Sequence, residues 1–307
     1  MHNLSIIQGN GERLRTITPH YLALGATLYM PATRMDLTEI LSLEKLPGLR
    51  SVVVCTEDAI HEHELPAALA NLEWTLDRLL PCPILRFIRP RNVAVLSQLV
   101  RMPGIETIDG IVLPKVTPQN LPAFAEAASR VPSLQLMPTI ETEVAFDRRQ
   151  LVALCDALQQ AVNPILCLRI GGSDLLSLLG LKRPKGLTLY DTPLRNVVND
   201  IILTFRPAGY DISAPVFEHV DSPATLEREV ELDIVHGLLA KTAIHPTQIT
   251  VIERAYRVSR QDREMAERIL DPGAQAVFQH QGQLCEPATH RRWAERLLLR
   301  SELFGLC

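Results

Sequence analysis

The sequence has 307 residues, of which 47% are hydrophobic, 21% charged and 5% aromatic, and its formal net charge is −4 at pH 7. This is the composition of an ordinary globular protein, and the acidic balance argues against a nucleic-acid-binding protein, which usually shows a basic face. The first residues lack the apolar core of a secretory signal, and no run has the length of a membrane span, so we expect no membrane partner. The length suits two average domains or one large α/β barrel.

Short β-rich runs alternate with longer helical patterns along the chain. The runs cover residues 26–31, 51–56, 83–88, 110–115, 134–140, 165–170, 213–217 and, less clearly, 237–244. Several are nearly continuous Val, Ile and Leu, which is typical of parallel strands covered on both faces. The stretches between them, such as 36–46, 65–80 and 121–131, repeat apolar residues at three- and four-residue spacing, which predicts amphipathic helices.

About eight β/α units predict an α/β fold, a (β/α)₈ TIM barrel over residues 20–260. A doubly wound open sheet is the rival, but no GxGxxG motif follows any run. We expect residues 171–193 to form a loop over the barrel mouth followed by a helix. Residues 261–307 are rich in Arg and predict a C-terminal helical extension that serves as a subunit contact.

The six cysteines include no CxxC pair, and Cys55 and Cys167 lie in apolar, strand-like runs. A free thiol in such a place behaves as a small hydrophobic group. We therefore expect all six thiols to be reduced and the protein to be cytoplasmic.

Polar side chains follow nearly every predicted strand, where the catalytic groups of a parallel barrel lie. In chain order they are Arg34, Glu57 with Asp58, Arg86 with Arg89 just beyond it, Lys115, Glu141, Asp174 and His245. A barrel with a purely structural role would have little reason for this pattern, so we predict a site at this end.

Glu141 and Asp174 follow neighbouring strands, with no His or Cys nearby, which suits a cation that prefers oxygen ligands. Mg²⁺ usually takes one or two carboxylates and keeps positions for water and substrate. Arg86 is the predicted ligand of a substrate carboxylate, because its planar guanidinium matches carboxylate geometry.

Each of these residues also has a structural interpretation. Glu141 alone suits the first turn of the next helix, where the helix dipole favours an acid. Arg34 suits a surface ion pair and Lys115 the end of a strand. For His245 the sequence favours a structural role and a site role equally.

Six motifs, taken in order, resemble the citrate lyase β-subunit-like proteins of the HpcH/HpaI aldolase group. They are MPATR (30–34), TEDA (56–59) followed by Arg86, GIVLPKV (110–116), IET (140–142), GGSDL (171–175) and AIHPTQ (243–248). The resemblance spans about residues 25 to 300 and is closest to a divergent branch of TIM-barrel C–C bond lyases, associated with tellurium-resistance-type stress operons.

The resemblance implies a trimeric or hexameric TIM barrel that makes or breaks a carbon–carbon bond beside a carbonyl. It implies Mg²⁺, or another divalent cation such as Mn²⁺, bound by Glu141 and Asp174. It further implies that Arg86 binds the substrate carboxylate and that Glu57 and Asp58 bind metal-bound waters. The substrate is then a 2-oxo acid or an acyl-CoA thioester. Glu286 stands where some relatives carry an acid/base Asp before a proline.

Cleavage beside a carbonyl leaves an enolate, whose charge a Lewis-acid cation stabilises. We expect Arg34 and Lys115 to help bind the substrate. Glu286, Asp58 and a metal-bound water are the candidates for the base, and the residues do not rank them.

Thr56, Ala32 and Ile88 depart from the family pattern. They motivate an alternative, in which the barrel is a catalytically inactive binding or regulatory protein of a stress-response operon. A phosphate-handling barrel is disfavoured, because no glycine-rich loop follows the last strands.

Overall fold

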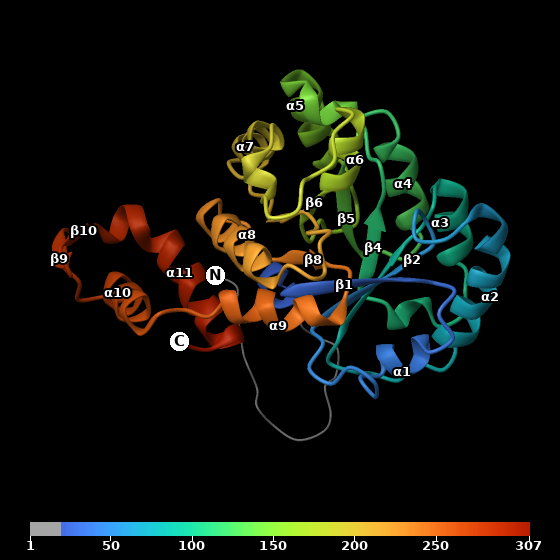
Figure 1. The fold of residues 1–307 in the computed structure, drawn as a ribbon, viewed down its shortest axis with the longest axis horizontal. Coiled ribbons are helices and arrows are strands. Elements are labelled where there is room, and N and C mark those ends of the chain that lie inside the picture. The colour runs from blue at the N-terminus through green and yellow to red at the C-terminus, as the bar shows by residue number, and fades with distance from the viewer. Residues whose placement is uncertain (1–19) are drawn as a thin grey trace.

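Eight parallel strands form a nearly closed barrel in the computed structural model, which describes residues 20–307 (Figure 1). The strands are β1 (Ala26–Pro31), β2 (Ser51–Cys55), β3 (Leu85–Arg89), β4 (Gly110–Leu113), β5 (Gln135–Ile140), β6 (Leu168–Ile170), β7 (Ile212–Ser213) and β8 (Lys241–Ala243). They pair in the order β7-β6-β5-β4-β3-β2-β1-β8, and a parallel bridge between Ala214 and Lys241 joins the two ends. The predicted TIM barrel is therefore confirmed, and each predicted run overlaps a strand.

Helices surround the sheet and connect successive strands (Figure 1). They are α1 (Leu37–Leu41), α2 (Leu65–Leu76), α3 (Val93–Leu99), α4 (Leu121–Ala128), α5 (Arg148–Leu158), α6 (Gly172–Leu178), α7 (Leu194–Phe205), α8 (Pro223–Val235) and α9 (Pro246–Ala255), with short 3₁₀ turns η1 (Tyr21–Leu24), η2 (Glu62–Glu64), η3 (Ile105–Thr107), η4 (Glu143–Phe146) and η5 (Leu189–Asp191). The expectation that a loop begins at residue 171 is wrong, because α6 starts at Gly172 and the loop follows it. No helix of the part described is both long and apolar enough to cross a bilayer.

Two hydrophobic clusters separate the inside of the barrel from its outer layer. The inner cluster includes Val53, Phe87, Val112 and Met137 from four strands, and Tyr21 of η1 lies with it. The outer cluster, between sheet and helices, takes the alternate residues of the same strands. Because side chains on a strand alternate between faces, this register decides which polar residues enter the barrel.

The C-terminal extension packs against the barrel end where strands begin. It contains α10 (Arg260–Leu270), a hairpin of β9 (Phe278–His280) and β10 (Gln283–Cys285), and α11 (Pro287–Phe304). The extension was expected to be helical, and the structure adds a hairpin between its two helices. Arg296 of α11 pairs with Asp211, just before β7, at 2.6 Å, and Arg50, just before β2, donates to the carbonyl of Leu303. The extension therefore covers the end opposite to the predicted site.

A buried ion cluster ties β8 to α8. Lys241 lies at 2.9 Å from Glu229 and 2.8 Å from Asp233, and all three side chains are fully buried. The pKa of Asp233 is raised to about 6 by burial, which Lys241 opposes. Such a cluster requires its cation, since removing one partner leaves an uncompensated buried charge.

Replacing Lys241 by Met is therefore expected to lower the free energy of unfolding by about 3–5 kcal/mol. Urea unfolding followed by circular dichroism measures this change. The control is Lys185→Met, which removes an exposed ion pair with Asp221 and should leave the unfolding midpoint unchanged. Equal midpoints for the two variants would contradict the stabilising role of the cluster.

Candidate active site

Glu141 lies at the end of β5, inside the mouth of the barrel. Its Oε1 accepts a 2.8 Å hydrogen bond from the backbone N–H of Lys115, and the residue is 3% exposed. Lys115 has a φ of 49°, a conformation that non-glycine residues rarely adopt and that often marks a functional site. The interpretation of Glu141 as an acid in the first turn of the next helix is wrong, because its carboxylate accepts from Lys115 after β4 and η4 begins after Thr142.

The carboxylates of Glu141 and Asp174 lie close enough for their charges to interact. Burial raises the pKa of Glu141 to about 7; the charge of Arg89 opposes this rise and that of Asp174 adds to it. Asp174 lies in the first turn of α6, and burial raises its pKa as well, against the opposing charge of Lys115. Both pKa values rise because the neighbouring cations do not fully offset the cost of burying the two carboxylates.

Lys115 joins the acidic pair that follows β2 to this site. Its Nζ lies 2.6 Å from Glu57 Oε1 and 2.9 Å from Asp58 Oδ2. Although partial burial opposes it, these hydrogen bonds raise the pKa of Lys115 above its ordinary value. Glu57 is buried whereas the Asp58 side chain is 54% exposed, so Asp58 is the member of the pair that solvent reaches.

Arg89, and not Arg86, is the arginine of the site. Arg86 is wholly buried and donates to the backbone carbonyls of Leu41 and Leu80, outside the barrel. Phe87 points inward, so the alternation of side chains along β3 sends Arg86 outward and brings Arg89 inward. The guanidinium of Arg89 lies 3.0 Å from Glu57 Oε2. The prediction for Arg86 is therefore wrong.

Arg34 is not brought into the site. Its guanidinium makes two 2.8 Å hydrogen bonds to the carboxylate of Asp36, which Lys45 also contacts at 2.9 Å. The Arg34 side chain is 45% exposed. The surface ion pair that the sequence left open is what the structure has, and the substrate-binding role is not supported.

Glu286 cannot act at the mouth of its own barrel. It lies between β10 and α11, in the extension at the opposite end of the barrel, far from β5 and β6 in Figure 1. Its carboxylate accepts a 3.1 Å hydrogen bond from Thr289. Position along the chain did not show to which end of the barrel the extension returns, so the structure does not bring Glu286 together with the other predicted site residues of its own chain.

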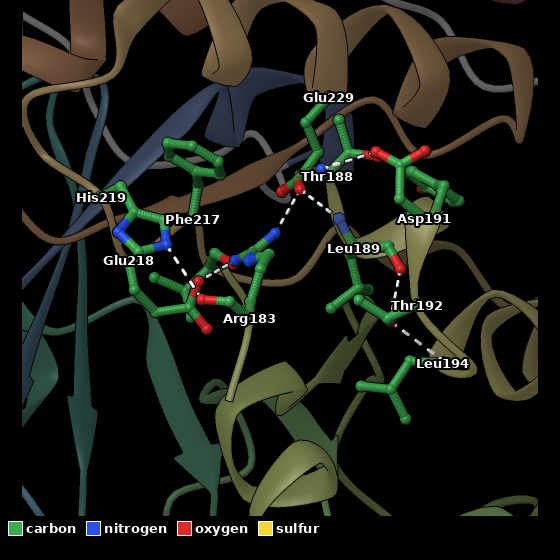
Figure 2. A network of polar contacts seen from close by, with 12 residues as sticks. Arg183, Thr188, Leu189, Asp191, Thr192, Leu194, Phe217, Glu218, His219 and Glu229 are labelled. Atoms are coloured by element: carbon green, nitrogen blue, oxygen red, sulfur yellow. Dashed lines mark hydrogen bonds and ion pairs between the residues drawn. The ribbon is translucent and has the colours of Figure 1, made fainter. Parts of the chain in front are cut away.

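A buried arginine fixes the loop that follows α6. Arg183 forms ion pairs with Glu218 and Glu229, and its guanidinium lies 4.9 Å from the ring of Phe217 (Figure 2). Glu218 also accepts a 3.2 Å hydrogen bond from Ser173, the neighbour of Asp174. This network holds the start of α6, and hence Asp174, in place.

His245 has a structural role. Its ring caps the N-terminus of α9 by accepting a hydrogen bond from the backbone N–H of Thr247. The structural interpretation of His245 is thus the one supported.

The acids at the mouth suit a cation with few protein ligands. Within residues 20–307, no group of three or more His, Cys, Asp or Glu side chains is arranged to hold a metal. Glu141 and Asp174 alone leave positions for water and substrate oxygens, which is the usual environment of Mg²⁺. A cation between them would also offset the cause of their raised pKa values. The residues present therefore fit a divalent cation.

Gly171 leaves room for Glu141. A Cβ at position 171 would overlap Cβ and Oε2 of Glu141, so any side chain there displaces the carboxylate. We expect Gly171→Ala to weaken Mg²⁺ binding by about 10–100-fold, as displaced ligand geometry does at other sites. Calorimetric titration with Mg²⁺ measures this change. Gly273→Ala, in the extension where a Cβ meets only ordinary contact, is the control and should bind as wild type does.

Comparisons with known proteins agree with this architecture. A family model described as C–C bond lyase of the TIM-barrel fold matches residues 18–306. A citrate lyase subunit β-like protein of Mycobacterium tuberculosis is 26% identical over 262 residues, which cover 81% of this chain and 87% of the relative.

Solved structures show the same fold. The structure of CitE from M. tuberculosis with magnesium, acetoacetate and coenzyme A superposes with a TM-score of 0.67 at 23% identity, covering 92% of this chain and 99% of that one. A citrate lyase of Burkholderia xenovorans gives a TM-score of 0.72 at 16% identity, over 92% of this chain and 93% of that one.

Proposed function

The chain belongs to the family of C–C bond lyases of the TIM-barrel fold, and from this premise we propose that it is a divalent-cation-dependent lyase acting beside the carbonyl of a 2-oxo acid or a hydroxyacyl thioester. The resemblance to the citrate lyase β-like proteins that the sequence showed is confirmed. The observation that carries the proposal is the buried Glu141 carboxylate, with a pKa near 7, whose charge interacts with Asp174 and Arg89.

The proposed cation is Mg²⁺, held by Glu141 and Asp174. Relatives support it, since CitE of M. tuberculosis is solved with magnesium and acetoacetate and a citrate lyase β subunit with magnesium and oxaloacetate. When bound, such a cation supplies Lewis-acid polarisation of a substrate carbonyl.

The chain's own residues then divide the remaining work. Arg89 binds and orients the substrate carboxylate, because it is the guanidinium that lies beside Glu57 and Glu141. Lys115 holds Glu57 and Asp58 and brings positive charge to the mouth. Asp58 is the proposed proton acceptor, because its side chain is 54% exposed at the mouth. Although burial opposes it, the hydrogen bond from Lys115 lowers the pKa of Asp58, which keeps this carboxylate ionised and able to accept a proton.

Three finer features stay predictions. They are the use of CoA, the cytoplasmic location and the assembly into trimers or hexamers through residues 261–307. The free state of all six cysteines agrees with the expected reduced thiols.

Calorimetry with pyruvate and oxaloacetate, with and without Mg²⁺, tests the proposal. We expect both acids to bind wild type only with the cation, and neither to bind Glu141→Gln/Asp174→Asn. Binding that is unaffected by Mg²⁺ and by this double substitution would contradict the proposed site. A folded wild-type protein that binds neither acid nor Mg²⁺ would favour the regulatory alternative.

A further inference from the structure

A second arginine, Arg169, lies inside the barrel one layer below Glu141. On β6 the flanking residues Leu168 and Ile170 belong to the outer cluster, so Arg169 points inward. Arg169 pairs in register with Thr139, and Glu141 lies two residues further along the same strand. That offset is about 6.6 Å along the strand. Arg169 therefore forms part of the floor beneath the proposed cation site.

The charge of Arg169 is poorly compensated. It is 2% exposed, donates a 2.6 Å hydrogen bond to Thr242 Oγ1, and has the thioether of Met137 at 3.7 Å as its other acceptor. Among residues 20–307 no carboxylate forms an ion pair with it. Charged residues are almost never buried unless they are paired, so a buried guanidinium with a hydroxyl and a thioether as acceptors points to an anion that arrives from outside the protein.

Two further features connect Arg169 to the substrate site. Its guanidinium lies 5.1 Å from the centre of the Tyr29 ring, and that of Arg89 lies 5.5 Å from the same centre, so both cations lie against one ring. Beside Arg169, the hydroxyl of Thr139 is buried and has no hydrogen-bond partner among the described residues. A buried donor of this kind usually has a partner.

We propose that Arg169, with Thr139 and Thr242, binds a second acidic group of the substrate and so selects a dicarboxylate over a monocarboxylate. This inference rests on the proposed function, because it assigns Arg89 to the carboxylate beside the reacting carbonyl and Arg169 to the group at the other end. A short dicarboxylate carries its two charges at opposite ends, and the two guanidiniums that lie against the Tyr29 ring offer one cation to each of them.

Arg86 shows what a structural arginine looks like in this protein. It lies on the outer face, where three hydrogen bonds to two backbone carbonyls hold its guanidinium. Arg169 has no such backbone acceptors in the described chain. The contrast gives a matched pair of buried arginines for experiment.

The first test compares oxaloacetate with 2-oxobutyrate, which has a methyl group where oxaloacetate has its second carboxylate. With Mg²⁺ present, wild type should bind oxaloacetate at least about tenfold more tightly, as a charge-assisted hydrogen bond predicts. Arg169→Met should lose this preference for oxaloacetate and keep the affinity for 2-oxobutyrate. Thr139→Val should also reduce the preference for oxaloacetate. Equal affinity of wild type for both acids overturns the inference and leaves the proposed function standing. Binding of neither acid removes both.

The second test needs no ligand. Removing a poorly compensated buried charge should leave the melting temperature of Arg169→Met unchanged or raise it, whereas Arg86→Met should melt at lower temperature. A loss of stability in Arg169→Met that matches that of Arg86→Met would show a structural role and overturn the inference. Binding measured on folded protein separates this outcome from loss of the fold.

Discussion

Replacing Glu141 by Gln is expected to slow Mg²⁺-dependent proton exchange beside the carbonyl of pyruvate by at least about 100-fold. Glutamine keeps the shape of the side chain but removes the charge that, with Asp174, would hold the cation. Its amide also places neutral atoms where a buried carboxylate now lies. Exchange of the methyl protons with deuterium, followed by nuclear magnetic resonance, measures enolisation without knowledge of the natural substrate.

The control for this variant is Glu143→Gln, two residues along the chain, where the side chain is exposed in η4. It should exchange at the wild-type rate. Circular dichroism should show that Glu141→Gln remains folded, since a carboxylate with a raised pKa in the folded state does not stabilise that state at neutral pH. A Glu141→Gln protein that exchanges normally would remove Glu141 from the site.

Replacing Arg89 by Met is expected to weaken substrate binding, whereas replacing Arg86 by Met is expected to lower stability. Arg89→Met should weaken Mg²⁺-dependent binding of pyruvate by about 10–100-fold, because it removes charge-assisted hydrogen bonds to the carboxylate. Arg86→Met should instead lower the free energy of unfolding by about 2–4 kcal/mol, because it removes three hydrogen bonds and leaves the buried carbonyl of Leu41 without the Arg86 donor.

Calorimetry and urea unfolding on both proteins separate the two roles. Arg86→Met that remains folded should bind pyruvate as wild type does. Should Arg86→Met lose binding while Arg89→Met keeps it, the assignment made from the register of β3 is wrong and the original prediction from the sequence stands.

The sequence alone was sufficient for the barrel. Runs such as SVVVC (51–55) are apolar on both faces, which is typical of a parallel sheet covered by helices. The position of Glu141 and Asp174 at the mouth could also be predicted, because each follows a strand and the ends of parallel strands meet at one end of a barrel. Their role as cation ligands stays a prediction. The same rule places Lys115, which follows β4, beside Glu57, Asp58 and Glu141.

The sequence could not decide which arginine of LRFIR (85–89) enters the barrel. Arg86 and Arg89 are three residues apart and therefore lie on opposite faces of β3, and only the packing of Phe87 into the inner cluster fixes the register. The alternation itself was a usable signal, since an inward Phe87 requires an inward Arg89.

Only the tertiary structure shows where Glu286, Arg34 and Arg169 lie and which groups they contact. The extension returns to the end where strands begin, which takes Glu286 away from the mouth, and Asp36 lies where it binds Arg34. In the sequence Arg169 is one residue of an apolar run. Only the strands that surround it in the structure show that no carboxylate among residues 20–307 pairs with it. Strand composition and strand ends are local properties that the sequence carries, whereas the partners of a charged side chain depend on residues distant along the chain, which folding alone brings together.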